Sequence, residues 1–369
     1  MLRTHACPLA LLSLVVACGG SAPPPAAAPP APALAPAPSA PSVAEASPPP
    51  AAATAAAPAP TPEEKKRADD ARQLKEDRAK WEEQHKTELA RWTPELHAEA
   101  KALADKTYPS GKTALLAATK GHHRSPANVE RDKYRHPIET LEFFGFKPTM
   151  TVLDVGPGEG WYTELLAPAL AKQGTYVATS ADPNGPPDER STFYAQRFRG
   201  FLESSPELYG KVQTLVVDSK APKLGKDGTF DMVVIMRGVH GMINAGTFDA
   251  WLSEIARALK PGGVLGIEEH RAKPDADPAA SAKKGYVPEK FVVDRAEAAG
   301  LKLAGKSEIN ANPKDTKDYP EGVWSLPPTY RLGDKDRDKY AAIGESDRMT
   351  LKFVKPAAKA PPPAGKPAK

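Results

Sequence analysis

Cysteine is nearly absent from this chain of 369 residues, which contains only Cys7 and Cys18. Two cysteines that both lie near the N-terminus provide neither a disulfide framework for a folded body nor a cysteine-based zinc site. A large excess of one sign of charge is also missing, because 50 Lys and Arg residues nearly balance 46 Asp and Glu residues, and the formal net charge is +4. No segment concentrates the positive charge, so the composition argues against a nucleic-acid partner.

Long apolar runs are missing as well. The apolar stretch from Leu9 to Val16 follows Arg3 and precedes small residues, which is the pattern of a secretory signal peptide over residues 1–17 and is too short to span a bilayer. The next residues, Val15-Val16-Ala17-Cys18, resemble the lipobox of bacterial lipoproteins. That resemblance implies a lipid on Cys18 that anchors the chain to a membrane of the bacterial cell envelope. A plain signal peptide with an incidental cysteine stays open.

The composition changes sharply after the cysteine. Residues 18–61 are almost entirely Ala and Pro, so they bury no core and predict a disordered tether of roughly 3.1 Å per residue. Residues 62–106 begin with mixed charges at helix-supporting spacing and predict a charged helical stalk. Trp81, Trp92 and Leu96 are the residues that would dock its far end onto the body.

The folded body is expected at residues 107–355, followed by a disordered Lys/Pro/Ala-rich tail at 356–369. Helical and strand patterns alternate through the body, which predicts an α/β fold. The expected sheet is mostly parallel, with helices on both faces and a ligand site at the carboxyl ends of the strands. The expected strands are 152–155, 175–180, 212–218, 230–236, 264–269, 301–309 and 350–354, and the main helices are 131–144, 161–170, 247–259 and 289–299.

Residues 151–160 carry the strongest signal: Thr-Val-Leu-Asp-Val-Gly-Pro-Gly-Glu-Gly. An apolar strand that contains Asp154 leads into three glycines at alternate positions, and a helix pattern follows. Glycine lacks a Cβ, so this turn allows the backbone to bend sharply and to approach a ligand closely. The free N–H groups at the start of the next helix favour the same use. A dinucleotide-binding fingerprint requires Gly-x-Gly-x-x-Gly, and Trp161 occupies the position of its last glycine.

The Gly-x-Gly-x-Gly spacing after an acid resembles motif I of the class I S-adenosylmethionine (SAM) methyltransferases. Residues 230–234, Phe-Asp-Met-Val-Val, resemble the fourth-strand motif of that superfamily, and residues 259–265, Leu-Lys-Pro-Gly-Gly-Val-Leu, resemble its Leu-Lys-Pro-Gly-Gly signature. Residues 135–141, 160–164 and 308–318 are similar to a bacterial subgroup of predicted methyltransferases. The resemblance covers roughly residues 125–355 and implies a Rossmann-like fold with SAM as cofactor.

The resemblance assigns cofactor-binding roles residue by residue. Asp154, Gly156, Gly158 and Gly160 match motif I, where the acid helps to hold the cationic methionyl end. Asp182 follows the second strand and corresponds to the acid that grips both ribose hydroxyls, since a carboxylate accepts two hydrogen bonds at once. Asp218 ends the third strand and corresponds to the residue beside the adenine amino group. An Asp-Pro turn at Asp182 and a strand-end cap at Asp218 stay open as structural alternatives.

The acceptor side is expected at the ends of the fourth and fifth strands. His240 follows the fourth strand, and its ordinary pKa near neutrality suits a general base for an acceptor that holds a proton. Glu268, Glu269, His270 and Arg271 end the fifth strand and are expected to face the same cleft, and Arg237 and Asn244 are candidate orienting groups. Purely structural roles stay open for His240, His270 and Arg271. His122 and His123 are read as a surface pair, since nothing nearby supplies a third ligand, so no metal site is predicted.

The compartment and the cofactor conflict, because SAM is made in the cytoplasm and the N-terminus predicts export. Three hypotheses follow. The chain is a SAM-dependent methyltransferase of an unidentified small-molecule or envelope acceptor, with cofactor available outside the cytoplasm. Alternatively, it is a membrane-tethered binding module that retains the methyltransferase fold without catalysis. In the third, the N-terminus does not direct export and the enzyme is cytoplasmic. The sequence does not indicate an oligomeric state.

Overall fold

The structure is a computed structural model that describes residues 61–357. The predicted signal peptide at residues 1–17, the lipidation site Cys18, all of the tether except Thr61, and the tail from residue 358 lie outside the described residues. None of the helices within residues 61–357 has both the length and the apolar character that crossing a bilayer requires.

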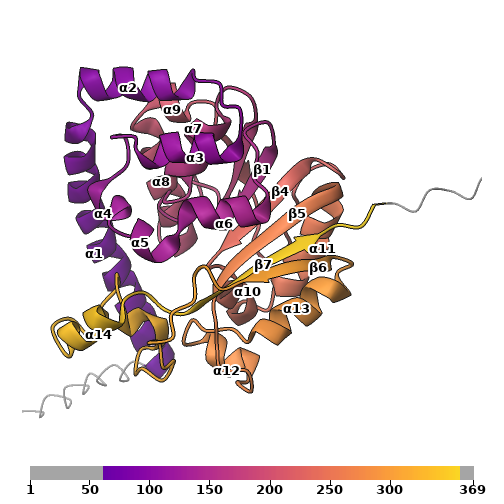
Figure 1. Ribbon diagram of the computed structural model, residues 1–369. Coiled ribbons are helices and arrows are strands. Elements are labelled where there is room, and N and C mark those ends of the chain that lie inside the picture. The colour runs from indigo at the N-terminus through magenta and orange to yellow at the C-terminus, as the bar shows by residue number, and fades with distance from the viewer. Residues whose placement is uncertain (1–60, 358–369) are drawn as a thin grey trace, which may run out of the picture. The chain divides into compact units, whose positions relative to one another are not determined.

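A seven-stranded sheet forms the centre of the fold, with the strand order β3-β2-β1-β4-β5-β7-β6. The strands from β3 to β5 are parallel, whereas β7 runs antiparallel to both of its neighbours. The predicted mostly parallel α/β sheet is therefore confirmed (Figure 1). The strands are β1 (Thr151–Val155), β2 (Thr175–Ser180), β3 (Gln213–Val216), β4 (Phe230–Met236), β5 (Leu259–His270), β6 (Lys302–Ser307) and β7 (Arg348–Val354).

Helices cover both faces of the sheet because alternate side chains of each strand point to opposite sides. On one face, Val152 joins a core cluster with side chains from α3 (Gly111–Thr119), α6 (Pro137–Phe144) and α7 (Thr163–Leu170). On the other face, Leu153 joins a cluster with α11 (Phe248–Ala258) and α13 (Glu289–Ala298). Fully burying one such large apolar side chain contributes about 1.5–3 kcal/mol.

The N-terminal helix α1 (Pro62–Arg91) begins at a complete capping box, in which Thr61 and Glu64 each bond the other's backbone N–H. Its first buried residue is Leu74. Farther along, Trp81 packs edge-on against Phe193 of α8 (Arg190–Glu203), with ring centroids 6.1 Å apart. The first turns of α1 therefore form without help from the body, and its second half lies on α8.

The next helix, α2 (Pro94–Ala104), differs from the predicted stalk. Trp92 and Leu96 are buried in the same core cluster as the sheet, which confirms their predicted docking. Ala100 and Ala104 are buried there as well, so α2 is part of the body rather than of a separate stalk. The mixed charges of α1 dominate this part of the sequence and conceal the apolar face of α2.

The helix predicted over residues 131–144 is wrong as a single element. It is divided into α5 (Asp132–Arg135) and α6 by His136, which has a left-handed φ of 39°. Pro137 explains the break, because a proline disfavours helical geometry in the residue before it.

The fifth strand also begins earlier than predicted, at Leu259, and includes the Pro-Gly-Gly segment. The remaining elements are α4 (Pro126–Val129), α9 (Pro206–Tyr209), α10 (Val239–Asn244), α12 (Pro278–Ala282), η1 (Gly322–Ser325) and α14 (Arg337–Ile343).

Candidate functional site

The turn between β1 and α7 uses its three glycines in two different ways. Gly156, Gly158 and Gly160 have φ values of 72°, 61° and 85°, which L side chains rarely adopt. A Cβ at Gly156 or Gly158 would meet no heavy atom of the described residues within 4 Å, whereas one at Gly160 would lie 2.7 Å from the ring of Phe201. The first two glycines therefore leave backbone open to a ligand, and the third allows α8 to pack closely. The Thr179 hydroxyl fixes the turn by accepting the N–H of Gly156 at 2.9 Å.

Asp154 lies beneath this turn with only 1% of its surface exposed. Its Oδ2 accepts a hydrogen bond from the Tyr176 hydroxyl at 2.8 Å, but no described residue binds its Oδ1. Burial raises the pKa of Asp154 to about 6, although the Tyr176 hydroxyl and the charge of Arg237 oppose this rise. A buried carboxylate oxygen without a partner fits a cationic ligand group, such as the methionyl ammonium of the implied cofactor.

Asp182 and Asp218 lie at equivalent places beyond neighbouring strands. Ser180 of β2 pairs with Val216 of β3, and each acid follows two residues later. Both are exposed, and both form turns: Asp182 Oδ1 accepts the N–H of Asn184, and Asp218 Oδ1 accepts that of Lys220, each at 2.9 Å. The turn roles that the sequence left open are thus present. In each acid, Oδ2 has no hydrogen-bond partner among the described residues, so a ligand role stays a prediction.

His240 and Glu269 form a hydrogen-bonded pair at the adjacent strand ends. His240 lies in α10, directly after β4, and its Nδ1 is 3.0 Å from Oε1 of Glu269 on β5. The same carboxylate accepts the backbone N–H groups of Val239, His240 and His270, at 2.6, 3.2 and 2.9 Å. Burial lowers the pKa of His240, but the facing Glu269 carboxylate outweighs this and the net pKa is raised. Because an ionised carboxylate only accepts, the Nδ1–H of His240 donates to Glu269. The Nε2 atom has no hydrogen-bond partner among the described residues and faces no competitor for a ligand.

His270 lies beside this pair, with its ring centroid 5.7 Å from that of His240. Its Nδ1 is 2.5 Å from the Ser346 hydroxyl, and burial together with the charges of His240 and Arg348 lowers its pKa well below the ordinary value. Ligand atoms of His240, Glu269 and His270 lie within 4.8 Å of one another, as in a loose metal-ligand set. Because both Glu269 oxygens already accept N–H bonds, the described arrangement is that of a hydrogen-bonded dyad with a neutral histidine beside it.

Arg271 turns toward a different set of partners. Its guanidinium bonds Asp347 at 2.9 and 3.1 Å, Glu308 at 2.6 and 2.8 Å and Glu289 at 3.3 Å. Three carboxylates surround one positive charge, so this side chain ties the ends of β5, β6 and β7 together. The structure brings His240 and His270 together but leaves the Arg271 guanidinium occupied.

The prediction that His122 and His123 form a surface pair is wrong for His123. His122 is exposed and contacts Glu99 at 2.8 Å, whereas His123 is buried and bonds the backbone carbonyl of Glu164 at 2.8 Å. Burial lowers the pKa of His123 to about 4. The small residues around this position give no local sign that one of the two rings enters the core.

Of the charged groups near His240, the sequence placed Glu268 and Arg237 on this side of the cleft but did not reveal their connection to Tyr162 and Arg348. Glu268 of β5 is fully buried and accepts a hydrogen bond from the Tyr162 hydroxyl at 3.1 Å. Its other neighbours are Arg237, which follows β4, and Arg348, which begins β7. These residues come from four separate elements, so no local spacing connects them.

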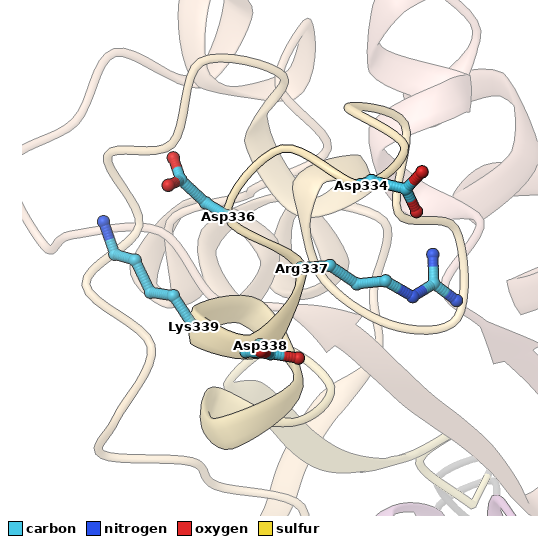
Figure 2. Close-up of a pocket in the computed structure, with 5 residues that line it drawn as sticks. All are labelled: Asp334, Asp336, Arg337, Asp338 and Lys339. Atoms are coloured by element: carbon cyan, nitrogen blue, oxygen red, sulfur yellow. The ribbon is translucent and has the colours of Figure 1, made fainter.

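A surface hollow lies on a separate part of the molecule, in the loop before α14 and its first turn. It is lined by the exposed side chains of Asp334, Asp336, Arg337, Asp338 and Lys339. Figure 2 shows these side chains extending in different directions rather than converging on one point. The hollow contains none of the residues at the strand ends described above.

Comparison with known proteins gives matches for the central part of the chain. Residues 128–299 match the model of a methyltransferase domain family. Over 135 residues the chain is 34% identical to the ubiquinone/menaquinone biosynthesis C-methyltransferase UbiE of Hydrogenovibrio crunogenus, which covers 37% of this chain and 46% of that relative. The chain thus matches about half the length of this curated relative.

Similar solved structures include a SAM-dependent methyltransferase from Aquifex aeolicus, with 20% identity, a TM-score of 0.41 and coverage of 63% of this chain and 94% of that one. The [4+2]-cyclase SpnF is similar with 17% identity and a TM-score of 0.46, covering 69% of this chain and 98% of that one.

Proposed function

Residues 128–299 match a methyltransferase domain family, and on that premise we propose that the chain is a class I SAM-dependent enzyme that transfers a methyl group from SAM to a small-molecule or envelope acceptor. The observation that supports this most directly is the pair of features at the end of β1. Open backbone at Gly156 and Gly158 adjoins the unpartnered, buried Oδ1 of Asp154. The amino-acid end of SAM would fit both, with its ammonium group on Asp154 and its backbone-like atoms against the turn.

Different residues would bind different parts of the cofactor. Asp154 would hold the ammonium group, and the turn at Gly156 and Gly158 would admit the amino-acid backbone atoms. Asp182 and Asp218, exposed at the ends of β2 and β3, would bind the ribose hydroxyls and the adenine edge through their free carboxylate oxygens. When bound, SAM supplies an electrophilic methyl group, and S-adenosylhomocysteine (SAH) is left once the acceptor atom has taken it.

On the acceptor side, His240 would act as the base for an acceptor that carries a proton. The Glu269 carboxylate fixes the Nδ1 proton, so Nε2 has its lone pair free to accept the proton that leaves the acceptor. His270 stays neutral and would contact the acceptor as a hydrogen-bonding group. Arg271 would act indirectly, by fixing the end of β5 through its three carboxylate partners.

For its location, we propose that the chain is anchored in the bacterial cell envelope by a lipid on Cys18, with the domain outside the cytoplasm. The signal-like residues 1–17 and the Ala/Pro-rich tether support this proposal. Cys18→Ser should move the protein from the membrane fraction to the soluble fraction. Unchanged fractionation of that variant would refute anchoring at Cys18.

Calorimetric titration of the full chain with SAM and, separately, with SAH tests the function. We expect micromolar binding that Asp154→Ala abolishes while the variant keeps its cooperative unfolding. If the folded chain binds neither compound, the proposal fails, and a tethered binding module with a methyltransferase fold becomes the better hypothesis.

A further inference from the structure

Four arginines gather around two glutamates at the ends of β4, β5 and β7, and we call them the arginine cluster: Arg131, Arg135, Arg237 and Arg348 with Glu268 and Glu345. The arginine side chains range from 1% exposed for Arg348 and 3% for Arg135 to 18% for Arg237 and 24% for Arg131. The two glutamates are 0% and 5% exposed. Four positive charges thus share two negative charges, an excess of two, in a largely dry environment.

The contacts within the cluster are shared and in part misaligned. Glu345 alone contacts Arg131 at 2.9 Å, Arg135 at 3.3 Å and Arg348 at 2.5 Å. Arg348 Nε lies 2.7 Å from Glu268 but lacks hydrogen-bond geometry with any described residue. Arg237 reaches Glu268 only at 3.2 Å. Burying charge without full compensation is costly, so an arrangement with surplus guanidinium groups favours an anion as the missing partner.

Two further acids lie near Arg237, but neither neutralises the surplus. Glu269 is hydrogen-bonded to His240 and to three backbone N–H groups. Asp154 is the counter-charge for the cofactor's ammonium in the proposed function. Burial lowers the pKa of Arg131, the Glu345 carboxylate opposes this, and the charges of Arg237 and Arg348 add smaller contributions in the same direction as burial. Arg131 shares its carboxylate partner Glu345 with Arg135 and Arg348, so one negative charge serves three guanidinium groups.

The position of the cluster assigns the anion to the acceptor. The nucleoside-side acids Asp182 and Asp218 follow β2 and β3, whereas Glu268 is on β5 and Arg348 on β7. Strands lie about 4.8 Å apart, so β7 is roughly 14 Å from β1 across β4 and β5. Arg237 links this region to the His240 dyad, because its charge acts on the pKa of His240. The partly exposed Arg237 and Arg131 form the solvent-facing part of the cluster.

We infer that the methyl acceptor carries an acidic group, a carboxylate or a phosphate, and that the arginine cluster binds it beside His240. Planar guanidinium groups suit both anions, since each can donate two parallel N–H bonds. This inference rests on the proposed function, because it names the substrate class of the same site. It also explains why a domain that binds a cationic cofactor places its positive charges on the β5 and β7 side.

The test uses the full chain saturated with SAH and titrated with succinate or inorganic phosphate. We expect saturable binding of at least one anion, weakened about tenfold or more by Arg131→Gln and by Arg237→Gln, with SAH affinity unchanged in Arg131→Gln. These two arginines are chosen because both are partly exposed, so the variants should fold. Arg295→Gln is the matched control, since Arg295 pairs with Asp249 on an exposed surface and should leave anion binding unchanged.

Three results would overturn the inference. Wild-type protein that binds no anion while SAH-loaded would do so, as would anion binding that both variants retain. The third uses 5′-methylthioadenosine, which lacks the amino-acid part of the cofactor. If Arg131→Gln binds SAH more weakly but this nucleoside normally, the cluster holds the cofactor's own carboxylate. Should the wild type bind neither SAM nor SAH, the proposed function fails separately. Arginine-dependent anion binding by the unliganded chain would then still support an acid-binding site.

Discussion

The two halves of the strand-end surface are built in different ways. At β1, β2 and β3 the site consists of a glycine turn, one buried acid and two exposed acids, all within a few residues of a strand end. At β4, β5 and β7 it consists of largely buried, long charged side chains from separate segments, with more arginines than glutamates. The first half exposes backbone and isolated carboxylates to a ligand of fixed shape. The second half concentrates charge, which suits recognition of a particular acceptor.

The largest expected effect is in the cofactor half. Gly158→Val should lower SAH affinity by at least roughly 100-fold, because it adds a branched side chain at a positive φ where the backbone faces open space. Gly228→Val is the control, since Gly228 has a φ of 62° against 61° for Gly158 and also lacks neighbours within 4 Å among the described residues. Both variants should lose about 1–3 kcal/mol of stability from strain. Equal SAH affinity in the two variants would remove the turn from the site.

At neutral pH, ionised Asp154 should lower the stability of the unliganded protein and strengthen its binding of SAH. A native pKa of about 6, against about 3.9 when unfolded, means that the folded state binds more protons between these values. Stability is therefore lost as pH rises through that window, by about 3 kcal/mol in total. Asp154→Asn should raise the unfolding free energy of the unliganded protein at neutral pH by up to that amount and should weaken SAH binding. Chemical denaturation at about pH 4.5 and about pH 7.5, below and above the native pKa of Asp154, measures the difference in stability.

The same carboxylate predicts how cofactor affinity depends on pH. An ammonium group binds ionised Asp154, so SAH affinity should increase as pH rises toward and past about 6. Calorimetric titrations across this range test the sign. Affinity that is flat with pH in the wild type, or that rises equally in Asp154→Asn, would contradict the assignment.

In the acceptor half, Glu269→Gln should lower the pKa of His240, since the Glu269 carboxylate is what raises it. Titration of the histidine ring protons by nuclear magnetic resonance measures this without knowledge of the acceptor. His240 should titrate above its ordinary value in the wild type, and His270 should stay neutral over the same range. A His240 pKa that Glu269→Gln does not change would reduce the dyad to a structural contact.

The smallest effects are expected at the exposed acids. Asp182→Ala and Asp218→Ala should each lower SAH affinity about two- to tenfold, the net value of one hydrogen bond at an exposed position where water competes for the carboxylate. Asp188→Ala is the control, because Asp188 is exposed in the same loop as Asp182 but does not follow a strand end. Equal affinities for all three variants and the wild type would leave the two acids with their turn roles alone.

The same contrast explains how far the sequence could predict the molecule. The sheet, its mostly parallel order and the residues of the glycine turn follow from local patterns: short apolar strands that alternate with helices, alternating glycines and an acid two residues earlier. The arginine cluster could not be predicted, because Arg131 and Glu345 are 214 positions apart and meet only through the sheet order. The helix break at His136 was predictable from Pro137, whereas the burial of α2 was hidden by the charges of α1.

The capping box at Thr61 has a consequence for how this protein can be modified. A helix that satisfies its own first N–H groups does not depend on the residues before it, and Leu74 is the first side chain that the body needs. Whatever segment precedes Thr61 can then be shortened, exchanged or cleaved at little cost to the fold. Replacing the residues before Thr61 should therefore leave the stability of the folded body unchanged.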